Sequence, residues 1–157
     1  MSLAWQTEAS HAVKCDLARE VLRSSGSLRL QVMGWSMLPT VWPGDTLLVE
    51  SAEPATVSEG DILLYHRDQK LFVHRVVNAK SHNTILTRGD AMPRPDPPVR
   101  PDQMLGRVVS IVRNGEAIKP NRKLRASQRA VAGLVRRSTL AARVVVGIHG
   151  LRKPARA

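Results

Sequence analysis

The 157-residue chain has a single cysteine, 3% aromatic residues and no long apolar run. Cys15 alone excludes an intramolecular disulfide and leaves no cysteine-rich zinc site. With so few aromatics, the core is expected to consist of Val, Leu and Ile. No stretch reaches the ~20 apolar residues of a spanning helix, and no basic region leads into an apolar run at the N-terminus. We therefore expect one compact domain without cofactor, either cytoplasmic or peripherally membrane-associated.

The basic residues are concentrated in the last third of the chain. Residues 1–105 hold 11 Lys or Arg and 12 Asp or Glu, whereas residues 106–157 hold 13 and one. A basic segment attached to a neutral domain indicates an anionic partner: phospholipid head groups, nucleic acid or an acidic protein. The chain has no aromatic platform and no nucleic-acid reading motif, so nucleic acid is the least favoured of these.

Local patterns predict a helix, then short strands, then a second helix. Within residues 8–24, one helical face is expected to carry the apolar residues Ala12, Val13, Leu17, Val21 and Leu22, and Ser24 to Ser27 ends that helix. Alternation and turn residues predict short strands, at 28–32, 46–50, 62–66, 71–77, 84–87 and 106–112. Residues 67–70 predict a hairpin turn, and Asn114-Gly115 predicts a turn after the last of these strands. Short strands at this spacing predict a mainly β, partly closed antiparallel fold. The expected division is an N-terminal helical segment (1–27), a β domain (28–119) and a basic tail (120–157).

The tail has a helical pattern from Ser127 onward. Arg129, Arg136 and Arg143 recur every seven residues, and the apolar side chains lie largely on another face. A basic amphipathic helix over 127–149 is typical of segments that lie on anionic membrane surfaces. The alternative is that its apolar stripe packs on the β domain while the arginines face water. The sequence leaves both open.

Ser36 is the most informative residue for chemistry. Pro39 disfavours helical geometry at Leu38, so the hydroxyl lies on an extended or turning segment. Gly34 allows a close backbone approach beside it. This is how a nucleophile is displayed, although an ordinary loop serine has the same surroundings.

Three ordered motifs carry a family resemblance over about residues 28–112. The first is Ser-Met-x-Pro-Thr-x-x-x-Gly-Asp at 36–45, the second is His-Arg-Val at 74–76, and the third is Arg-Gly-Asp at 88–90 followed by Asp96. Together they resemble the signal peptidase I and LexA-type serine peptidases. Their order and spacing are most similar to the archaeal and endoplasmic-reticulum branch of signal peptidases. That branch usually carries membrane anchors, and this chain departs from it there.

The resemblance implies a serine nucleophile with a histidine base. Ser36 would attack, and His74 stands where lysine-type relatives carry their base. An imidazole titrates near neutral pH and is usable as a base without heavy desolvation. An acid that fixes its tautomer is needed, and the resemblance places Asp96 there with Asp90 as the supporting aspartate. Both aspartates could instead be turn residues.

Three neighbours of Ser36 complete the expected site. The Ser36 N–H is the expected oxyanion donor. Gly34 stands where many lysine-type relatives carry a second hydroxyl, so that help is absent. Trp35 stands where relatives have a small residue; it either walls the substrate cleft or is merely exposed. Met37 is expected beside the substrate.

The sequence therefore predicts a serine endopeptidase that cuts extended peptides, with small residues flanking the bond by family analogy. One alternative is an inactive, peptidase-like domain that binds a peptide or partner. Another is a LexA-like self-cleaving regulator, which is less favoured because only about thirty residues precede the first motif.

Overall fold

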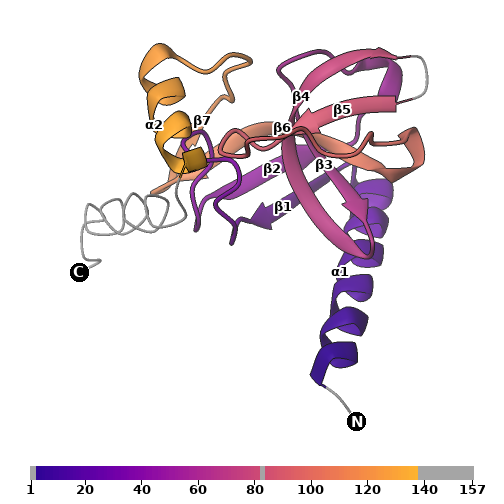
Figure 1. The fold of residues 1–157 in the computed structure, drawn as a ribbon. Coiled ribbons are helices and arrows are strands. Elements are labelled where there is room, and N and C mark those ends of the chain that lie inside the picture. The colour runs from indigo at the N-terminus through magenta and orange to yellow at the C-terminus, as the bar shows by residue number, and fades with distance from the viewer. Residues whose placement is uncertain (1–2, 82–83, 138–157) are drawn as a thin grey trace.

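The computed structural model describes residues 3–81 and 84–137. Within them, one long helix leads into a β sheet and a second helix follows it (Figure 1). The elements in chain order are α1 (Leu3–Ser25), β1 (Ser27–Gln31), β2 (Thr46–Glu50), the short 3-10 helix η1 (Pro54–Thr56), β3 (Ile62–Arg67), β4 (Lys70–Ser81), β5 (Thr84–Arg88), η2 (Pro101–Gln103), β6 (Met104–Arg113), β7 (Glu116–Ile118) and α2 (Ala126–Arg137).

All strand pairs are antiparallel, and the order across the sheet is β1-β2-β6-β3-β4-β5, with β7 also paired to β6. The mainly β, antiparallel prediction is thus confirmed. The seven-stranded sheet does not close, because β1 and β5 stand at opposite ends of the order. Register shifts within the β2–β6, β3–β6 and β4–β5 pairs bend the sheet.

Two tight turns follow directly from sequence. Asp68 and Gln69 both have positive φ (47° and 59°), which is the geometry of a two-residue hairpin between β3 and β4. Asn114 and Gly115 (φ 53° and 86°) connect β6 to β7 in the same way. Both turns lie where the sequence predicted them, while β4 and β6 extend several residues beyond the predicted strands.

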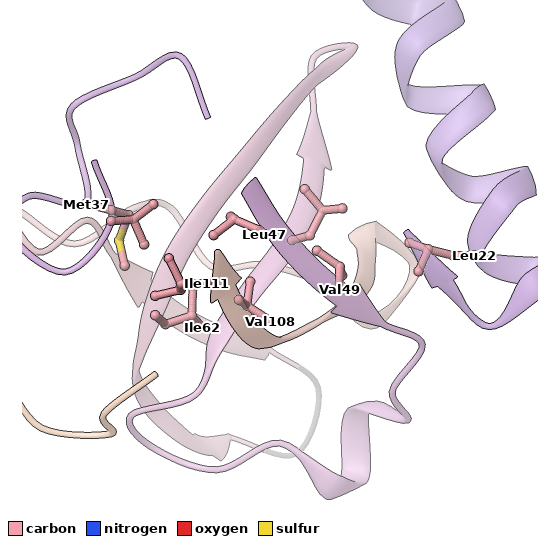
Figure 2. Close-up of a cluster of buried hydrophobic side chains, with 9 residues drawn as sticks. Leu22, Met37, Leu47, Val49, Ile62, Val108 and Ile111 are labelled. Atoms are coloured by element: carbon pink, nitrogen blue, oxygen red, sulfur yellow. The ribbon is translucent and has the colours of Figure 1, made fainter. Parts of the chain in front are cut away.

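The core has two main clusters on either side of β3. Ile62 and Leu64 point into the first cluster, whereas Leu63 and Tyr65 point into the second, so this strand is buried on both faces. Figure 2 shows the first cluster, which joins Leu22 of α1 to sheet residues and to Met37 of the loop that carries Ser36. The core therefore anchors the segment next to the predicted nucleophile.

The face that α1 buries differs from the predicted one. Cys15, Ala18 and Leu22 are buried, and they recur at i, i+3 and i+7. Val13 and Leu17, which the sequence placed on the packed face, are 65% and 61% exposed. The helix contacts β1, β4 and β6, and in Figure 1 its N-terminal part runs away from the sheet. Among the described helices, none combines the length and apolar character that a membrane crossing requires.

The described part of the C-terminal helix packs on the β domain. Val135 is buried in a third cluster with Leu38 and Ala91, and Val131 packs against the same cluster. The packing alternative therefore holds for this part, and Leu134 is its large exposed apolar residue at 57%. The rest of the segment over 127–149, including Arg143, lies outside the described residues.

Candidate active site

Ser36 lies in a compact turn that the core holds in place. Met37 and Leu38 are 3% and 0% exposed, so the residues after Ser36 are fixed by burial while the hydroxyl stays at the surface of the core. The turn is closed by hydrogen bonds from the Leu38 N–H to the Trp35 carbonyl and from the Val41 N–H to the Met37 carbonyl. Rigid placement of this kind is what a nucleophile needs.

The chain leaves this turn through an ion pair. Asp45 accepts a hydrogen bond from the Trp42 N–H at 2.8 Å and binds Arg113 of β6 at 2.7 Å and 3.0 Å. Arg113 also donates to the Thr40 carbonyl at 3.0 Å. Asp45 is therefore a structural aspartate, as its place in the first motif predicted.

His74 lies on β4 with its imidazole between a hydroxyl and a carboxylate. Its Nε2 is 3.0 Å from the Ser36 Oγ, and its Nδ1 is 2.7 Å from the Asp96 Oδ2. His74 is 5% exposed, and the Asp96 side chain is 18% exposed. The three motifs, far apart in sequence, thus converge on one point, with the serine at one ring nitrogen and the aspartate at the other.

The Asp96 carboxylate determines which nitrogen of His74 carries the proton. Burial raises the pKa of Asp96, but hydrogen bonds from His74 and then Thr87 outweigh it, and the pKa is held below its ordinary value of 3.8. Asp96 is then an ionised acceptor at neutral pH. Nδ1 must therefore be the protonated nitrogen, which leaves Nε2 free to accept a proton from Ser36.

Asp96 is positioned by its neighbours on two strands. The Thr87 hydroxyl on β5 donates to Asp96 Oδ2 at 2.8 Å, and the Asp96 N–H donates to the Thr87 carbonyl at 2.8 Å. At the end of β3, Arg67 donates to the carbonyls of Pro97 and Pro98 at 2.7 Å and 3.1 Å. Hydrogen bonds to β3 and β5 therefore hold three consecutive residues of the proline-rich loop, which are Asp96, Pro97 and Pro98.

Tyr65 closes the buried side of the imidazole. It is fully buried, its hydroxyl is 3.3 Å from His74 Nδ1, and its ring is stacked on Phe72 with centroids 5.5 Å apart. Burial raises the pKa of Tyr65, so it stays a neutral phenol. A neutral hydroxyl beside Nδ1 shields the His74–Asp96 hydrogen bond from water without adding charge.

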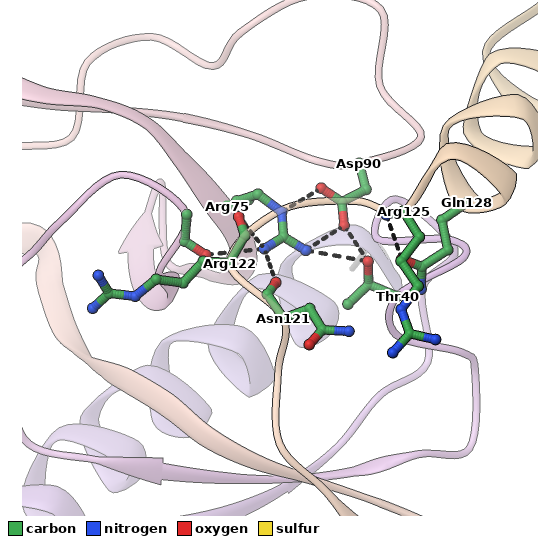
Figure 3. Close-up of polar contacts among 8 residues, drawn as sticks. Thr40, Arg75, Asp90, Asn121, Arg122, Arg125 and Gln128 are labelled. Atoms are coloured by element: carbon green, nitrogen blue, oxygen red, sulfur yellow. Dashed lines mark hydrogen bonds and ion pairs between the residues drawn. The ribbon is translucent and has the colours of Figure 1, made fainter.

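Asp90 belongs to a different cluster, shown in Figure 3. Its Oδ1 accepts from Arg75 Nε and its Oδ2 from Arg75 Nη2, both at 2.8 Å, and the Thr40 hydroxyl also donates to it. The ion pair is buried, with side chains 8% and 4% exposed. The sequence placed Asp90 among the candidate catalytic residues, but here its carboxylate binds the arginine next to His74, not the imidazole.

The segment around Asp90 touches Ser36 directly. The Ala91 N–H donates to the Ser36 carbonyl at 2.9 Å. A Cβ on Gly89 would lie 2.6 Å from that same carbonyl oxygen and 3.1 Å from His74 Nε2. Glycine permits this approach, because a side chain here would force the Ser36 carbonyl or the His74 ring to shift.

The C-terminal segment also reaches the site. Arg75 Nη1 donates to the carbonyls of Asn121 at 2.7 Å and Gly60 at 2.9 Å. With Thr40 and Asp90, four separate segments therefore meet at one guanidinium (Figure 3). Nearby, Arg122 pairs with Asp61 at 3.2 Å. The contacts cross the boundary that the sequence placed between residues 119 and 120.

A groove of about 250 Å³ leads to the Ser36 hydroxyl. Gly34, Met37 and His74 line it together with apolar residues of β1 and β4, so Gly34 and Met37 lie where the sequence expected them. Trp35, which is 39% exposed, is not part of the lining of this groove. Its exposed alternative therefore fits better than a role in walling the cleft. In the described part of the chain, no cluster of three or more His, Cys, Asp or Glu could hold a metal ion.

The fold and this site define a class: an antiparallel β domain that displays a serine, a histidine and an aspartate in contact. A family model for peptidase S24-like domains matches residues 2–109. The chain therefore belongs to the peptidase S24-like family, and the resemblance to the LexA and signal peptidase superfamily is confirmed at that level. None of the curated proteins compared with the chain matches it.

Sequence reasoning missed several residues that hold this site together. Thr87 and Tyr65 contact the Asp96–His74 pair, and Arg67 holds the loop that carries Asp96. Thr87 directly precedes the Arg-Gly-Asp motif, and Tyr65 lies inside a predicted strand, so their positions were visible but their partners were not. Long-range contacts such as Arg67 to Pro97 leave no local signal.

Proposed function

We propose that this protein is a serine endopeptidase in which Ser36 is the nucleophile, His74 the general base and acid, and Asp96 the group that orients His74. The observation that carries the proposal is the position of one imidazole 3.0 Å from a hydroxyl and 2.7 Å from a carboxylate, on opposite ring nitrogens. Nucleophile, base and orienting acid within hydrogen-bond reach are the signature of activated-serine hydrolysis.

The chemistry follows from this arrangement. Nε2 of His74 takes the proton of Ser36 as Oγ attacks the peptide carbonyl carbon, and the imidazolium that forms is stabilised by Asp96. The carbon–nitrogen bond then breaks, and the leaving amine receives the proton from Nε2. A water molecule, deprotonated in the same way, attacks the ester on Ser36 and releases the second product.

The oxyanion that forms in the reaction needs a hydrogen-bond donor, and the Ser36 N–H on the rigid turn is the one we assign. Gly34 has no side chain to add a second donor, although a Cβ there would meet no atom within 4 Å. This open space allows a direct test of the family comparison, because Gly34→Ser can place a hydroxyl there without a clash.

The groove supports a peptide substrate in extended form. β1 ends the sheet and pairs with β2, so its other edge can accept a strand. The lining near Ser36 is apolar, with Val32, Met37, Val41 and Val73 among its residues. A groove of this size suits apolar side chains, the smallest lying next to the bond, as the resemblance to signal peptidases implies. The substrate class favoured is therefore an extended apolar peptide that resembles a signal peptide.

The test is cleavage of an extended-peptide library by the full-length protein, with products read by mass spectrometry. Ser36→Ala and His74→Ala are expected to abolish cleavage. The unfolding midpoint should stay close to wild type in Ser36→Ala and fall in His74→Ala, which removes the partner of Asp96, while both variants keep the wild-type circular dichroism spectrum. Ser127→Ala, an exposed serine on α2, serves as the matched control and is expected to keep full activity. Cleavage retained by Ser36→Ala would remove Ser36 from the mechanism.

A separated serine and histidine would favour the alternative of an inactive binding domain, and the 3.0 Å contact gives it no such support. Self-cleavage, the LexA-like alternative, would proceed at a rate independent of protein concentration, and a dilution series distinguishes it from cleavage in trans. A contact of residues 127–149 with anionic membranes stays a prediction. Co-sedimentation of the full chain with phosphatidylserine vesicles tests it against vesicles of phosphatidylcholine alone.

A further inference from the structure

The groove at Ser36 continues into a second hollow that ends at α1. This hollow has a volume of about 560 Å³ and shares Leu30, Gln31, Met33, Leu71 and Phe72 with the first. Its remaining lining residues are His11, Lys14 and Lys70. The path from the nucleophile is therefore apolar at first and becomes basic at its far end.

The far end carries a cationic group on each side. Lys14 comes from α1 and Lys70 from the first position of β4, and both side chains are exposed. Asp68 lines the adjoining hollow with His11 and Lys70, whereas Lys14 is not among the lining residues of that hollow. Ammonium groups on flexible stems attract a carboxylate as point charges and adapt to its position.

We propose that Lys14 and Lys70 form a specificity site for an acidic side chain of the substrate, at a distance from the scissile bond. The proposal rests on the peptidase function proposed above. Preferred substrates are then extended peptides with apolar residues next to the cleaved bond and Asp or Glu farther along, on one side of it. Met33, which is 85% exposed at the junction of the two hollows, contacts the apolar part of such a peptide.

Charge favours a separate polypeptide over the C-terminal segment of this chain as the source of the bound peptide. Residues 106–157 of this chain contain 13 Lys or Arg and one acidic residue. A segment of that composition is repelled by Lys14 and Lys70, so the chain's own tail is a poor occupant of the groove. A separate, acidic polypeptide is the complementary partner.

The experiment walks one glutamate through a set of peptides. Each peptide has Ala at the two positions flanking the central bond, Val and Leu outside them and Gln elsewhere, and a single Glu replaces Gln at successive positions on both sides. We expect one position at which Glu raises kcat/KM several-fold over Gln, about 2–5-fold for each exposed ion pair, and less in high salt. The variant Lys14→Glu/Lys70→Glu should reverse the preference toward Lys there. Lys119→Glu, which changes an exposed lysine after β7, should not.

Binding to the Ser36→Ala variant, followed by fluorescence anisotropy, separates this site from the chemistry. The specificity site is refuted, even when cleavage proceeds, if there is no position at which a Glu peptide binds tighter than the Gln peptide. It is also refuted if the Lys14→Glu/Lys70→Glu change leaves the preference for Glu intact. If a charge-reversible preference in binding appears without any cleavage, the site stands and the peptidase proposal fails.

Discussion

Asp90 and Asp96 lie six residues apart, and the structure gives them separable roles. We predict that Asp96→Asn loses most of the catalytic rate with a modest loss of stability. Asp90→Asn should lose much more stability while the molecules that remain folded keep a larger share of the rate. The two substitutions are isosteric, so a difference between them reports the partner of each carboxylate and not the volume.

The cost at Asp90 follows from its buried partner. Arg75 donates two hydrogen bonds of 2.8 Å to this carboxylate, and both side chains are less than 10% exposed. Removing one charge of a buried pair leaves the other uncompensated and costs about 3–5 kcal/mol of unfolding free energy. The Gly60 and Asn121 carbonyls still accept from Arg75, which places the expected loss at the lower end, about 3 kcal/mol.

The cost at Asp96 is mainly kinetic. Its partner His74 can be neutral, and its side chain is 18% exposed, so the expected stability loss is about 1.5 kcal/mol, the lower value for a charge-assisted hydrogen bond. An asparagine amide favours the wrong imidazole tautomer, and kcat should fall on the order of 10⁴-fold. Because His74 and Thr87 both bind the Asp96 Oδ2, an amide nitrogen in its place would also face the Thr87 hydroxyl, which must then accept instead of donating.

The assay pairs urea unfolding, followed by circular dichroism, with kcat measured on one peptide well below the unfolding midpoint. The reasoning is refuted if Asp90→Asn lowers kcat as far as Asp96→Asn under those conditions. It is equally refuted if Asp96→Asn is the less stable of the two.

Three further outcomes are expected. Because the pKa of Asp96 is lowered in the fold, its stabilising contribution is present above pH 3.8 and is lost as the pH falls through the folded pKa. The difference in unfolding free energy between wild type and Asp96→Asn should therefore shrink in acid. A difference that stays constant with pH would contradict this. Gly89→Ala should lower kcat at least tenfold, because the new methyl group must displace the Ser36 carbonyl or the His74 ring. The control Gly133→Ala on α2, where a Cβ meets nothing within 4 Å, should leave kcat unchanged. Equal rates in both variants would show that Gly89 is not needed. Val135→Ala should lower the unfolding free energy by about 2 kcal/mol and lower kcat through the contact with Leu38. Leu134→Ala, at an exposed position of the same helix, should change neither. A loss of stability with kcat intact would show that α2 does not support the site.

The β architecture was predictable because its signals are local. Alternation of apolar residues and turn residues at 67–70 and 114–115 placed the hairpins, and antiparallel pairing followed from short connections. The helix α1 was predicted, but its buried face was not. Apolar periodicity suggested that Val13 and Leu17 pack inward, yet the sheet meets the helix along Cys15, Ala18 and Leu22. Which stripe a helix buries depends on the docking angle, and the sequence of the helix alone does not contain it.

The site was predictable to the extent that motifs carried it. Ser36, His74 and Asp96 each stand in a quoted motif, and the structure brings them together. Residue chemistry alone could not separate Asp96 from Asp90, since both follow turn-forming residues close to one strand end, and only the family resemblance favoured Asp96. What separates them is tertiary: Arg75 shares the strand with His74 but points to the other aspartate. Successive strand residues face opposite sides, and this alternation sends each aspartate a different partner.

The same alternation gives the C-terminal segment its access to the chemistry. His74 faces the nucleophile and Asp96, so Arg75 faces away from them, toward Asp90, Gly60 and the carbonyl of Asn121. A displacement of the segment after β7 would therefore act on β4 one residue from the base, and on Leu38, two residues from the nucleophile, through Val135. Residues 119–137 lie outside the range that matches the peptidase S24-like family, yet they contact Arg75 and Leu38, the neighbours in sequence of His74 and Met37.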